Sequence, residues 1–322
     1  MILVTGGAGF IGSAVVRRLL EDGNDVRVVD NLSKGRSGNV PSSCEYIEAD
    51  VSDPAISRRA FAGVDVCFHL AAKIGGIGYF HRYPADILDE NNLMLSSIFR
   101  TATDAGAKVV YVSSSMVFER AGQFPTPEDA IDRFPPPFSA YGFSKLIGEW
   151  YCRAFHEQFG TTFAIARPFN AYGPGEFPEF EPGLAHVIPD LIKKILEGPR
   201  PLRIFGDGTQ TRSFTYVDDV ADAIVTIGLD PRGSGEDFNI GTGVETSVNE
   251  LLVHLWRICG EEGEPAVFHE PALSVDVQRR VPDVTKIRAR LEWASRVGLE
   301  EGLERTVSWY RSERRAPAPA GG

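Results

Sequence analysis

The chain has 322 residues, of which 43% are hydrophobic and 24% are charged, and its 33 Lys and Arg against 44 Asp and Glu give a formal net charge of −11. This length and composition are sufficient for a large core, in one large domain or two intimate ones. The acidic balance disfavours a nucleic-acid partner, because no basic stripe offsets it, and no apolar run approaches the roughly 18 residues of a membrane span.

The first predicted elements are a strand over Ile2–Thr5 and a helix over Ile11–Asp22, joined by glycines at positions 6, 9 and 12. A backbone without Cβ atoms can approach a pyrophosphate closely. The N-terminus of the following helix offers it unpaired N–H groups and the positive end of a dipole. Strand, glycine triplet and helix in this order predict a dinucleotide-binding turn.

The next predicted strand, Asp25–Asp30, ends on a carboxylate. Asp30 lies about 20 residues after the turn, where an acid accepts hydrogen bonds from the adenosine ribose hydroxyls of a dinucleotide. Its charge would repel a 2′-phosphate, so we expect NAD rather than NADP, although Lys34 and Arg36 nearby would favour NADP. The alternative is a tight strand–helix turn without a ligand.

Strand and helix patterns then alternate through the first half of the chain. Short apolar runs of the kind buried on both faces of a parallel sheet are predicted as strands at Cys44–Glu48, Val64–Leu70, Lys108–Ser113 and Thr162–Arg167. Between them, helices are predicted at Pro54–Phe61, Ala85–Ala105 and Tyr141–Phe159. The alternation predicts an α/β fold with a Rossmann-type, doubly wound parallel sheet.

After Pro168 the composition changes. Residues 171–213 are rich in Pro, Gly, Glu and Phe, with a helix near Ile188–Leu196, and a strand–helix pair returns at Phe214–Leu229. A strand follows at Phe238–Gly241, and 247–258 and 285–312 are predicted helices. We therefore expect 1–170 plus 214–240 to form the sheet domain. We expect 171–213 plus 241–315 to form a smaller C-terminal α/β lobe over the carboxyl ends of the strands, where such sheets bind ligands. Residues 316–322 are an expected disordered tail.

Tyr141 and Lys145 are a second informative feature. They stand four residues apart in a predicted helix and therefore share one face. The ammonium, with an oxidised nicotinamide, would favour the phenolate and lower the tyrosine pKa from about 10. Such a phenol can take a proton from a sugar hydroxyl while hydride leaves the same carbon. Just upstream, the hydroxyl cluster Ser113–Ser115 could share the hydrogen bond to the reacting oxygen. Taken singly, a chance helix pair and a polar strand end are the alternatives.

Taken together, these motifs resemble those of the extended short-chain dehydrogenase/reductase family, the NAD-dependent nucleotide-sugar epimerases and dehydratases. The resemblance covers nearly the whole chain and is specific for the family, much less so for the member. Besides the glycine turn, Asp30, the serine cluster and the Tyr/Lys pair, it is carried by Asp50-Val51, His69-Leu70-Ala71-Ala72, Asn92, Arg167–Pro174, Gly206-Asp207-Gly208, Thr211–Phe214, Asp218-Asp219-Val220 and Asn239-Ile240-Gly241.

The resemblance implies a role for each matching residue. It implies the catalytic residues Ser114, Tyr141 and Lys145. The NAD-binding residues it implies are Gly6, Gly9, Phe10, Ile11, Gly12, Asp30, Asn31, Ser33, Asp50, Val51, Leu70, Ala71, Ala72, Lys73, Asn92, Tyr141, Lys145 and Pro168. The residues implied to bind a nucleotide-diphosphate sugar are Ser115, Met116, Asn170, His186, Val187, Arg212 and Arg279, with Arg280 as the alternative to Arg279. The arginines and Asn170 would contact the diphosphate, and Asn92 would help hold the active-site network. No residues have metal-ligand spacing, so no metal is expected.

Met116 narrows the implied reaction. The family's dehydratases and decarboxylases resemble one another in an acidic pattern ending in glutamate near this position, and its GDP-fucose synthases and GDP-mannose 3,5-epimerases carry a cysteine there. A methionine exchanges no proton, which leaves C4 epimerisation through a transient 4-keto sugar, with hydride transfer to and from bound NAD. The run Ala72–Gly78 and His186 resemble GDP-fucose synthases and 3,5-epimerases instead, although a glycine-rich loop and a histidine lining a sugar pocket are the simpler interpretations. A 3,5-epimerase or reductase, a dehydratase, and a non-catalytic NAD-binding protein are the other hypotheses.

Three further expectations concern the whole protein. The resemblance implies a homodimer formed through helices 85–105 and 141–159. The four cysteines have no C-x-x-C spacing and indicate reduced thiols of a cytoplasmic protein, and no signal peptide is expected before the strand at Ile2. The acidic loop that contains Glu176 is interpreted as a solvated rim of the lobe.

Overall fold

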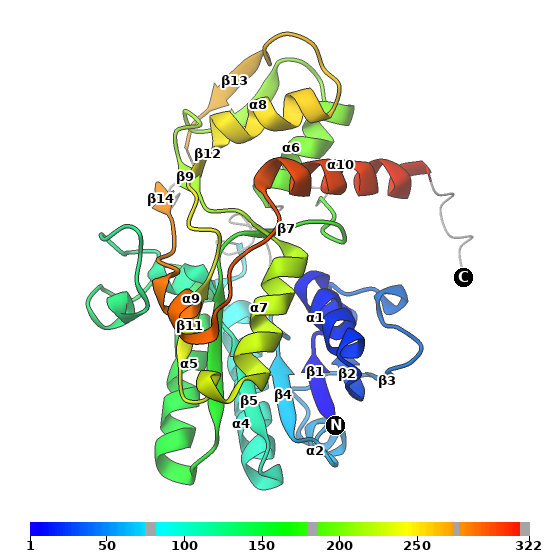
Figure 1. Cartoon of the computed structure of the whole chain (residues 1–322), viewed down its shortest axis with the longest axis vertical. Coiled ribbons are helices and arrows are strands. Elements are labelled where there is room, and N and C mark those ends of the chain that lie inside the picture. The colour runs from blue at the N-terminus through cyan, green and yellow to red at the C-terminus, as the bar shows by residue number, and fades with distance from the viewer. Residues whose placement is uncertain (75–81, 179–185, 273–276, 316–322) are drawn as a thin grey trace.

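The computed structural model describes residues 1–74, 82–178, 186–272 and 277–315, and these contain a central parallel sheet of seven strands (Figure 1). The spatial order is β3-β2-β1-β4-β5-β6-β11, and every neighbouring pair is parallel. The strands are β1 (Ile2–Thr5), β2 (Val26–Asp30), β3 (Glu45–Glu48), β4 (Val66–His69), β5 (Lys108–Val112), β6 (Phe163–Pro168) and β11 (Asp237–Ile240). The order reverses between β1 and β4, so the carboxyl ends of these strands border the crevice where ligands of such sheets bind.

The predicted strands are confirmed, with ends that move by no more than two residues. The predicted run Val64–Leu70, for example, forms a strand over Val66–His69. Alternate residues of each strand face opposite helical layers: Val4 and Val28 contribute to one core, Leu3 and Val29 to the other. This double burial explains why the strands appear in the sequence as continuous apolar runs.

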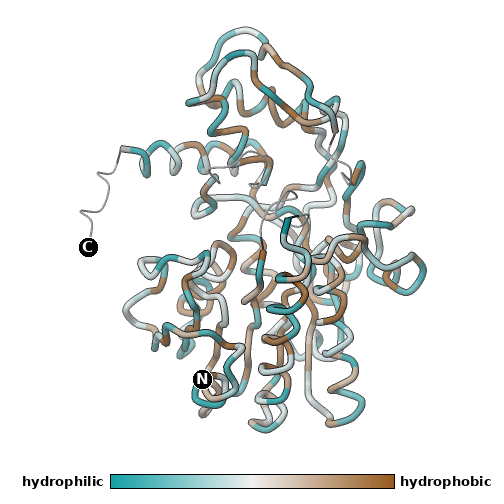
Figure 2. Tube along the Cα trace, turned by 180° about the vertical axis from the view of Figure 1, so that it is seen from behind, coloured by the Kyte–Doolittle hydropathy of each residue, from teal (hydrophilic) through white to brown (hydrophobic). Residues whose placement is uncertain are grey.

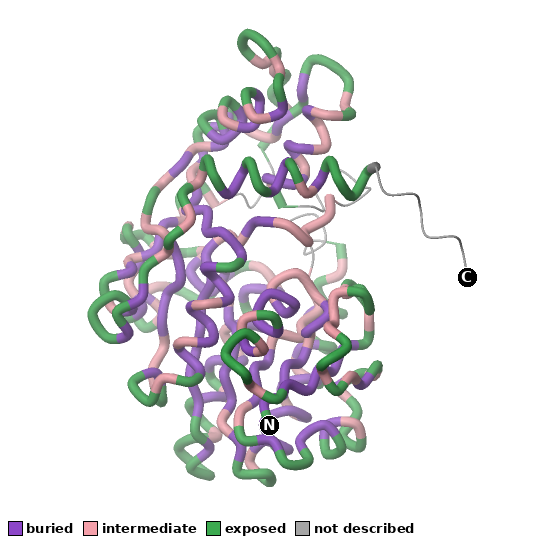
Figure 3. Tube along the Cα trace, turned by 45° about the vertical axis from the view of Figure 1, so that its right-hand side comes forward, coloured by how far each residue is buried: buried purple, intermediate pink, exposed green. Residues whose placement is uncertain are grey.

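Helices cover both faces of the sheet. One layer consists of α1 (Phe10–Glu21), α7 (Val217–Leu229) and α9 (Thr285–Leu291), and the other of α2 (Pro54–Ala60), α4 (Pro84–Ala105) and α5 (Ala140–Phe159). Buried residues follow the strands and the inner faces of these helices (Figure 3), and hydrophobic stretches run along the strands seen from behind (Figure 2). The Rossmann-type fold class is therefore confirmed.

A smaller lobe lies over the carboxyl ends of the strands, at the top of Figure 1. Its helices are α6 (Val187–Glu197), α8 (Val248–Ile258) and α10 (Leu299–Arg315), which share a core that includes Ile188, Leu251 and Leu303. Its strands pair as β8 (Leu202–Phe205) with β13 (Val267–Glu270), and as β12 (Thr246–Ser247), β9 (Thr211–Arg212) and β14 (Arg279–Arg280) in one three-stranded sheet. Two short strands, β7 (Ala171–Tyr172) and β10 (Thr215–Tyr216), connect the lobe to the sheet domain.

The helix expected over 285–312 is two helices in different layers. After α9 the chain turns at Glu292, which has a left-handed φ of 57°, and α10 begins only at Leu299. Val284, Ile287 and Leu291 are buried in the core of the sheet domain, so α9 belongs to that domain and not to the lobe, where the expected boundary had put it. The remaining boundaries, at 170 and 213, stay predictions.

Short 3-10 turns occur at η1 (Ser37–Asn39), η2 (Ser115–Phe118), η3 (Glu128–Asp132) and η4 (Pro231–Gly233). In the described ranges, every helix is too short or too polar to cross a membrane. The expected disordered tail and the glycines at 75, 76 and 78 lie outside the described residues.

Candidate active site

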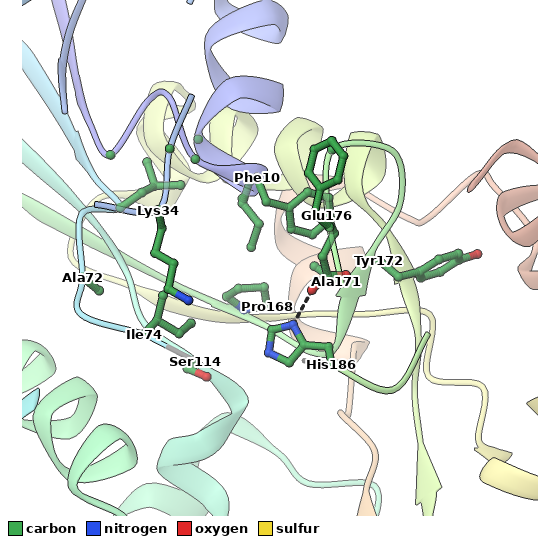
Figure 4. A pocket seen from close by; sticks show the side chains of 18 of the residues that line it. Phe10, Lys34, Ala72, Ile74, Ser114, Pro168, Ala171, Tyr172, Glu176 and His186 are labelled. Atoms are coloured by element: carbon green, nitrogen blue, oxygen red, sulfur yellow. Dashed lines mark hydrogen bonds and ion pairs between the residues drawn. The ribbon is translucent and has the colours of Figure 1, made fainter. Parts of the chain in front are cut away.

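One cavity of about 1300 Å³ runs along the carboxyl ends of the strands, between the sheet and the lobe. Pockets for single small ligands usually measure roughly 300–1,000 Å³, so this one has room for two ligands side by side. All but two of the residues predicted to bind cofactor or substrate, or to act in catalysis, line it; the exceptions are Asn92 and Arg279. Figure 4 shows part of its wall, with Lys34, Ile74 and Ser114 on one side and Glu176 and His186 on the other.

The glycines of the β1–α1 turn have different structural roles. A Cβ atom on Gly12 would lie 2.0 Å from the carbonyl oxygen of Gly6, and one on Gly6 would lie 2.7 Å from the backbone nitrogen of Ala71. These two glycines are therefore required by the packing of the turn. A Cβ on Gly9 would meet only the Gly6 oxygen, at 3.3 Å. Since Gly9 lines the cavity, the space its missing side chain leaves is open to a ligand.

Asp30 holds its carboxylate rigidly in the cavity wall. Its two oxygens accept hydrogen bonds from the backbone nitrogens of Ala8 (3.0 Å) and Leu32 (2.8 Å), and only 8% of the residue is exposed. Arg36, which could favour a 2′-phosphate, places its guanidinium 3.4 Å from the centre of the Phe177 ring. This arrangement favours the ribose hydroxyls of NAD over the phosphate of NADP.

Tyr141, Lys145 and Ser114 come together at one end of the cavity. Tyr141 lies in the first turn of α5. Ser139 caps the N-terminus of this helix, because the Ser139 hydroxyl accepts a 2.9 Å hydrogen bond from the backbone nitrogen of Gly142. The Lys145 ammonium lies 5.9 Å from the centre of the Tyr141 ring and donates a 2.9 Å hydrogen bond to the Val112 carbonyl. The Ser114 side chain is hydrogen-bonded to the Tyr141 phenol. One phenol, one ammonium and one hydroxyl thus share a site.

Burial has the largest effect on the pKa values of Tyr141 and Lys145. It raises the pKa of Tyr141 well above the ordinary value, and the hydrogen bond to Ser114 opposes the shift. The lowered tyrosine pKa that the sequence predicted is therefore not found for the chain by itself, because desolvation of the phenolate is the larger effect. Burial also lowers the pKa of Lys145 to about 8, although the Glu149 carboxylate acts in the opposite direction.

Asn91, and not Asn92, holds the loop beside the site. The side-chain oxygen of Asn91 accepts a 2.7 Å hydrogen bond from the backbone nitrogen of Lys73. The side-chain nitrogen of Asn91 donates a 3.0 Å hydrogen bond to the Ser144 hydroxyl in α5. Asn92 does not line the cavity. The role expected of Asn92 stays a prediction; the hydrogen bonds to Lys73 and Ser144 come from its neighbour Asn91, whose side chain points about 100° away around α4.

Two arginines of the lobe line the cavity from adjacent strands. Arg212 in β9 and Arg280 in β14 are register partners, so they share a face of the small sheet. Arg279 faces the other way and donates two hydrogen bonds to the Glu245 carboxylate, at 2.7 and 2.8 Å. Of the two alternatives, Arg280 and not Arg279 therefore lines the cavity, because successive residues of a strand point to opposite faces.

His186 lines the cavity at the start of α6 and is paired with Glu176 (Figure 4). The His186 side chain is 56% exposed at the cavity wall. Desolvation lowers its pKa, but the Glu176 carboxylate outweighs this effect and raises the pKa. The Glu176 side chain is only 11% exposed, so its interpretation as a solvated rim was wrong. Asn170 lies nearby with a left-handed φ of 40°, and its side chain donates a 3.2 Å hydrogen bond to the Ser213 carbonyl.

Sequence reasoning did not identify Glu149 or Asn91 as site residues. Glu149 follows Lys145 by four residues on the same helix, a spacing that could have indicated a contact. Among the described residues, no three His, Cys, Asp or Glu side chains are close enough to hold a metal ion.

Comparison with known proteins identifies what this site resembles. The model of the NAD dependent epimerase/dehydratase family matches residues 2–241. A UDP-glucose 4-epimerase of Mycolicibacterium smegmatis is 38% identical, over 97% of this chain and 98% of that protein. The crystal structure of UDP-glucose 4-epimerase from Thermotoga maritima with UDP-glucose has a TM-score of 0.89 and 36% identity, and covers 98% of this chain and 99% of that one. A UDP-glucuronic acid decarboxylase of Xenopus tropicalis is 32% identical, over 97% of this chain and 72% of that protein.

Proposed function

The chain belongs to the NAD dependent epimerase/dehydratase family, and we propose that it is a nucleotide-sugar 4-epimerase. The proposed reaction inverts the configuration at C4 of the sugar through a transient 4-keto sugar. The substrate is a nucleotide-diphosphate sugar, and UDP-glucose is the first to test, since a relative and a structural neighbour are UDP-glucose 4-epimerases.

The family confirms the prediction of NAD as cofactor, and the residues of this chain fit it. Gly9 leaves open space at the N-terminus of α1, which suits a pyrophosphate. The ordered carboxylate of Asp30 suits the adenosine ribose, and Asp50 and Val51 line the wall beyond it. When bound, NAD supplies the acceptor and donor of hydride.

Tyr141 supplies the proton transfers in this proposal. In its phenolate form Tyr141 takes the proton of the sugar 4-hydroxyl as C4 is oxidised, and the resulting phenol returns this proton to the oxygen after the keto sugar has rotated in the cavity. Ser114, hydrogen-bonded to the phenol, stabilises the charge that develops on the oxygen. The Lys145 ammonium favours the phenolate, which burial alone disfavours.

The diphosphate must stay in place while the sugar turns. Arg212 and Arg280 offer two guanidinium groups on one face of the β9–β14 pair, and a guanidinium binds phosphate oxygens bidentately. Asn170 lines the wall between these arginines and the catalytic residues. We infer that these three side chains bind the diphosphate.

The observation that carries the proposal is the set of groups beside Tyr141. Dehydration or decarboxylation needs a further acid or base next to the sugar, and Met116, which lines the cavity two residues after Ser114, exchanges no proton. Its thioether packs against Tyr141 and Ile87 as part of an apolar cluster. C4 inversion needs no proton donor beyond the phenol.

Product analysis in deuterated water tests the proposal. The enzyme is incubated with UDP-, dTDP-, GDP- and ADP-sugars, and the products are identified by NMR. We expect inversion at C4 without uptake of deuterium into carbon-bound positions. The Tyr141→Phe variant should lose turnover and still bind NAD. A variant that keeps most of its activity would refute the role of the phenol.

One observation favours a second candidate, an epimerase that acts at C3 or C5 like the GDP-mannose 3,5-epimerases. The Glu176–His186 pair is a carboxylate that orients and charges an imidazole inside the cavity, an arrangement suited to general acid–base catalysis. Incorporation of deuterium at C3 or C5, lost in the His186→Asn variant, would support this function instead.

We also propose that the protein is a cytoplasmic homodimer formed through α4 and α5. The two helices pack against each other through Phe99, Tyr151 and Phe155, and α5 leaves Phe143 (42% exposed) and Trp150 (64% exposed) uncovered at a seven-residue spacing. Two apolar residues two turns apart lie on one helix face, which suits helix–helix packing. All four cysteines are free thiols, as expected in a reducing compartment.

A further inference from the structure

A buried carboxylate lies one helical turn below the catalytic lysine. Glu149 follows Tyr141 and Lys145 at positions i+8 and i+4 of α5, so all three lie on the face that packs on the sheet. Its side chain is 1% exposed. One oxygen accepts a 2.5 Å hydrogen bond from the Ser113 hydroxyl, and both accept bonds from Arg167, at 2.7 Å each.

Arg167 connects Glu149 to a second carboxylate at the edge of the sheet. Its side chain is fully buried in β6 and also donates a 2.6 Å hydrogen bond to Asp237 in β11. Asp237 in turn accepts a 2.6 Å bond from Lys286 in α9, which reaches solvent. Breaking such a buried pair is costly, because the remaining charge is left without a partner. Glu149, Arg167, Asp237 and Lys286 thus form a line of alternating charges, which runs from the helix of the catalytic residues to the surface.

The groups around the Lys145 ammonium show which of them acts on it electrically. From β5, the ring of Tyr111 lies 5.2 Å away, and burial raises its pKa, so it is neutral. From β4, His69 is neutral too, because burial and the nearby ammonium lower its pKa to about 3. Tyr141 on α5 is a neutral phenol in the chain by itself, because burial raises its pKa. Glu149 is the group that opposes the effect of burial on Lys145.

We propose that Glu149 is a positioning residue for the reaction: its carboxylate, paired with Arg167, holds Lys145 in its ammonium form beside Tyr141. This inference rests on the proposed function, since it assigns the charge of Lys145 a task there. It also explains the bond from Ser113: this bond connects the residue before Ser114 to the carboxylate that lies one helical turn after Lys145 on α5. One buried acid thus sets both the charge of the lysine and the position of the serine.

A neutral isostere tests the electrical part of the role. The Glu149→Gln variant keeps the size of the side chain and an oxygen for Ser113, but removes the charge. We expect the pKa of Lys145 to fall by about one pH unit, as for an ammonium that loses a neighbouring carboxylate. The readout is NMR titration of the Cε resonance of isotope-labelled lysine in the whole protein with NAD bound, assigned by its loss in Lys145→Arg. The alkaline limb of the pH–kcat/KM profile should move to lower pH by the same amount.

The control is Asp237→Asn, at the other end of the line of charges. It also removes a carboxylate from Arg167 and should lower stability, but it should leave the Lys145 titration and the alkaline limb in place. If Glu149→Gln leaves the Lys145 titration unchanged, or if Asp237→Asn moves it equally, Glu149 has only a structural role and the inference is overturned. Should Glu149→Gln not fold, Glu149→Asp, which retains a more distant charge, is expected to lower the Lys145 pKa by a smaller amount; an unchanged titration in that variant overturns the inference too.

The NMR titration separates this inference from the proposed function. It measures the protonation of Lys145 whether or not any sugar nucleotide is turned over. A protein with no 4-epimerase activity but a shifted titration in Glu149→Gln would refute the reaction and retain the role of Glu149. An active 4-epimerase in which Glu149→Gln leaves the Lys145 titration unshifted would support the reaction and refute the role of Glu149.

Discussion

Arg279 and Arg280 are neighbours in β14 with the same charge, and the structure predicts that their removal affects nucleotide binding differently. Arg280 lines the cavity beside Arg212, whereas Arg279 turns away and is bound to Glu245. We therefore expect Arg280→Ala to weaken nucleotide binding and Arg279→Ala to leave it nearly unchanged. Each variant changes the net charge equally, so long-range electrostatics cannot explain a difference between them.

The size of the effect follows from the bonds that the guanidinium makes. A hydrogen bond to a charged group contributes about 1.5–3 kcal/mol, which corresponds to roughly 10- to 150-fold in a binding constant. Arg280→Ala should therefore weaken binding of UDP to the NAD-loaded protein by about this factor. Arg279 has its partner on the protein surface, and its removal should change binding by no more than about twofold.

Isothermal titration calorimetry with UDP measures both variants without any assumption about the reaction. A circular-dichroism melt shows whether each variant is folded. Equal weakening in Arg279→Ala and Arg280→Ala, or no weakening in either, would refute the assignment of Arg280 to the diphosphate.

Three further predictions concern the cofactor turn, the buried charges and the quaternary structure. Gly9→Ala should fold but lose at least about tenfold in NAD affinity measured by fluorescence, whereas Gly12→Ala should be insoluble or melt early, since its Cβ would lie 2.0 Å from a backbone oxygen; equal melting temperatures would contradict this. Burial alone would raise the pKa of Asp237, but Arg167 and Lys286 hold it well below its ordinary value. The ionised carboxylate therefore stabilises the fold above about pH 4 and stops doing so as the pH falls below it. Asp237→Asn should accordingly melt below the wild type at pH 7, with a gap that narrows toward acid pH; a constant gap would exclude the ionic explanation. Trp150→Glu should convert a dimer into a folded monomer in light scattering, with the exposed Phe268→Glu as control, and a dimer in both variants would place the interface elsewhere.

Much of the fold and the centre of the site could be predicted because local geometry decides them. A strand buried on both faces must be apolar throughout, which makes β1, β2 and β5 recognisable. The close packing of the turn excludes a Cβ at Gly6 and Gly12, which explains two of the three glycines. The helical period alone places Tyr141 and Lys145 on one face, whatever else packs around them.

Tertiary packing decided which residues make contacts between different helices and strands. In a strand of two residues the sequence gives no reason to prefer Arg279 or Arg280, and only the pairing of β14 with β9 sets Arg280 beside Arg212. In α4, the contact with Ser144 selects Asn91 over its neighbour. The raised pKa of Tyr141, where burial outweighs the hydrogen bond to Ser114, could not be read from the residue types, since it depends on how much water the folded chain excludes.

Sequence by itself thus determined the family and the cofactor, and it placed Tyr141 and Lys145 on one helix face, because each of these rests on short motifs whose spacing is local. Only the tertiary structure decided which arginine lines the cavity, in which layer α9 lies and which carboxylate is buried one helical turn from Lys145. Glu149 and Arg167 are 18 residues apart, and they meet because α5 packs over the carboxyl half of β6. Contacts of this kind depend on how helices and strands are placed relative to one another, and the spacing of residues within one element does not predict this placement.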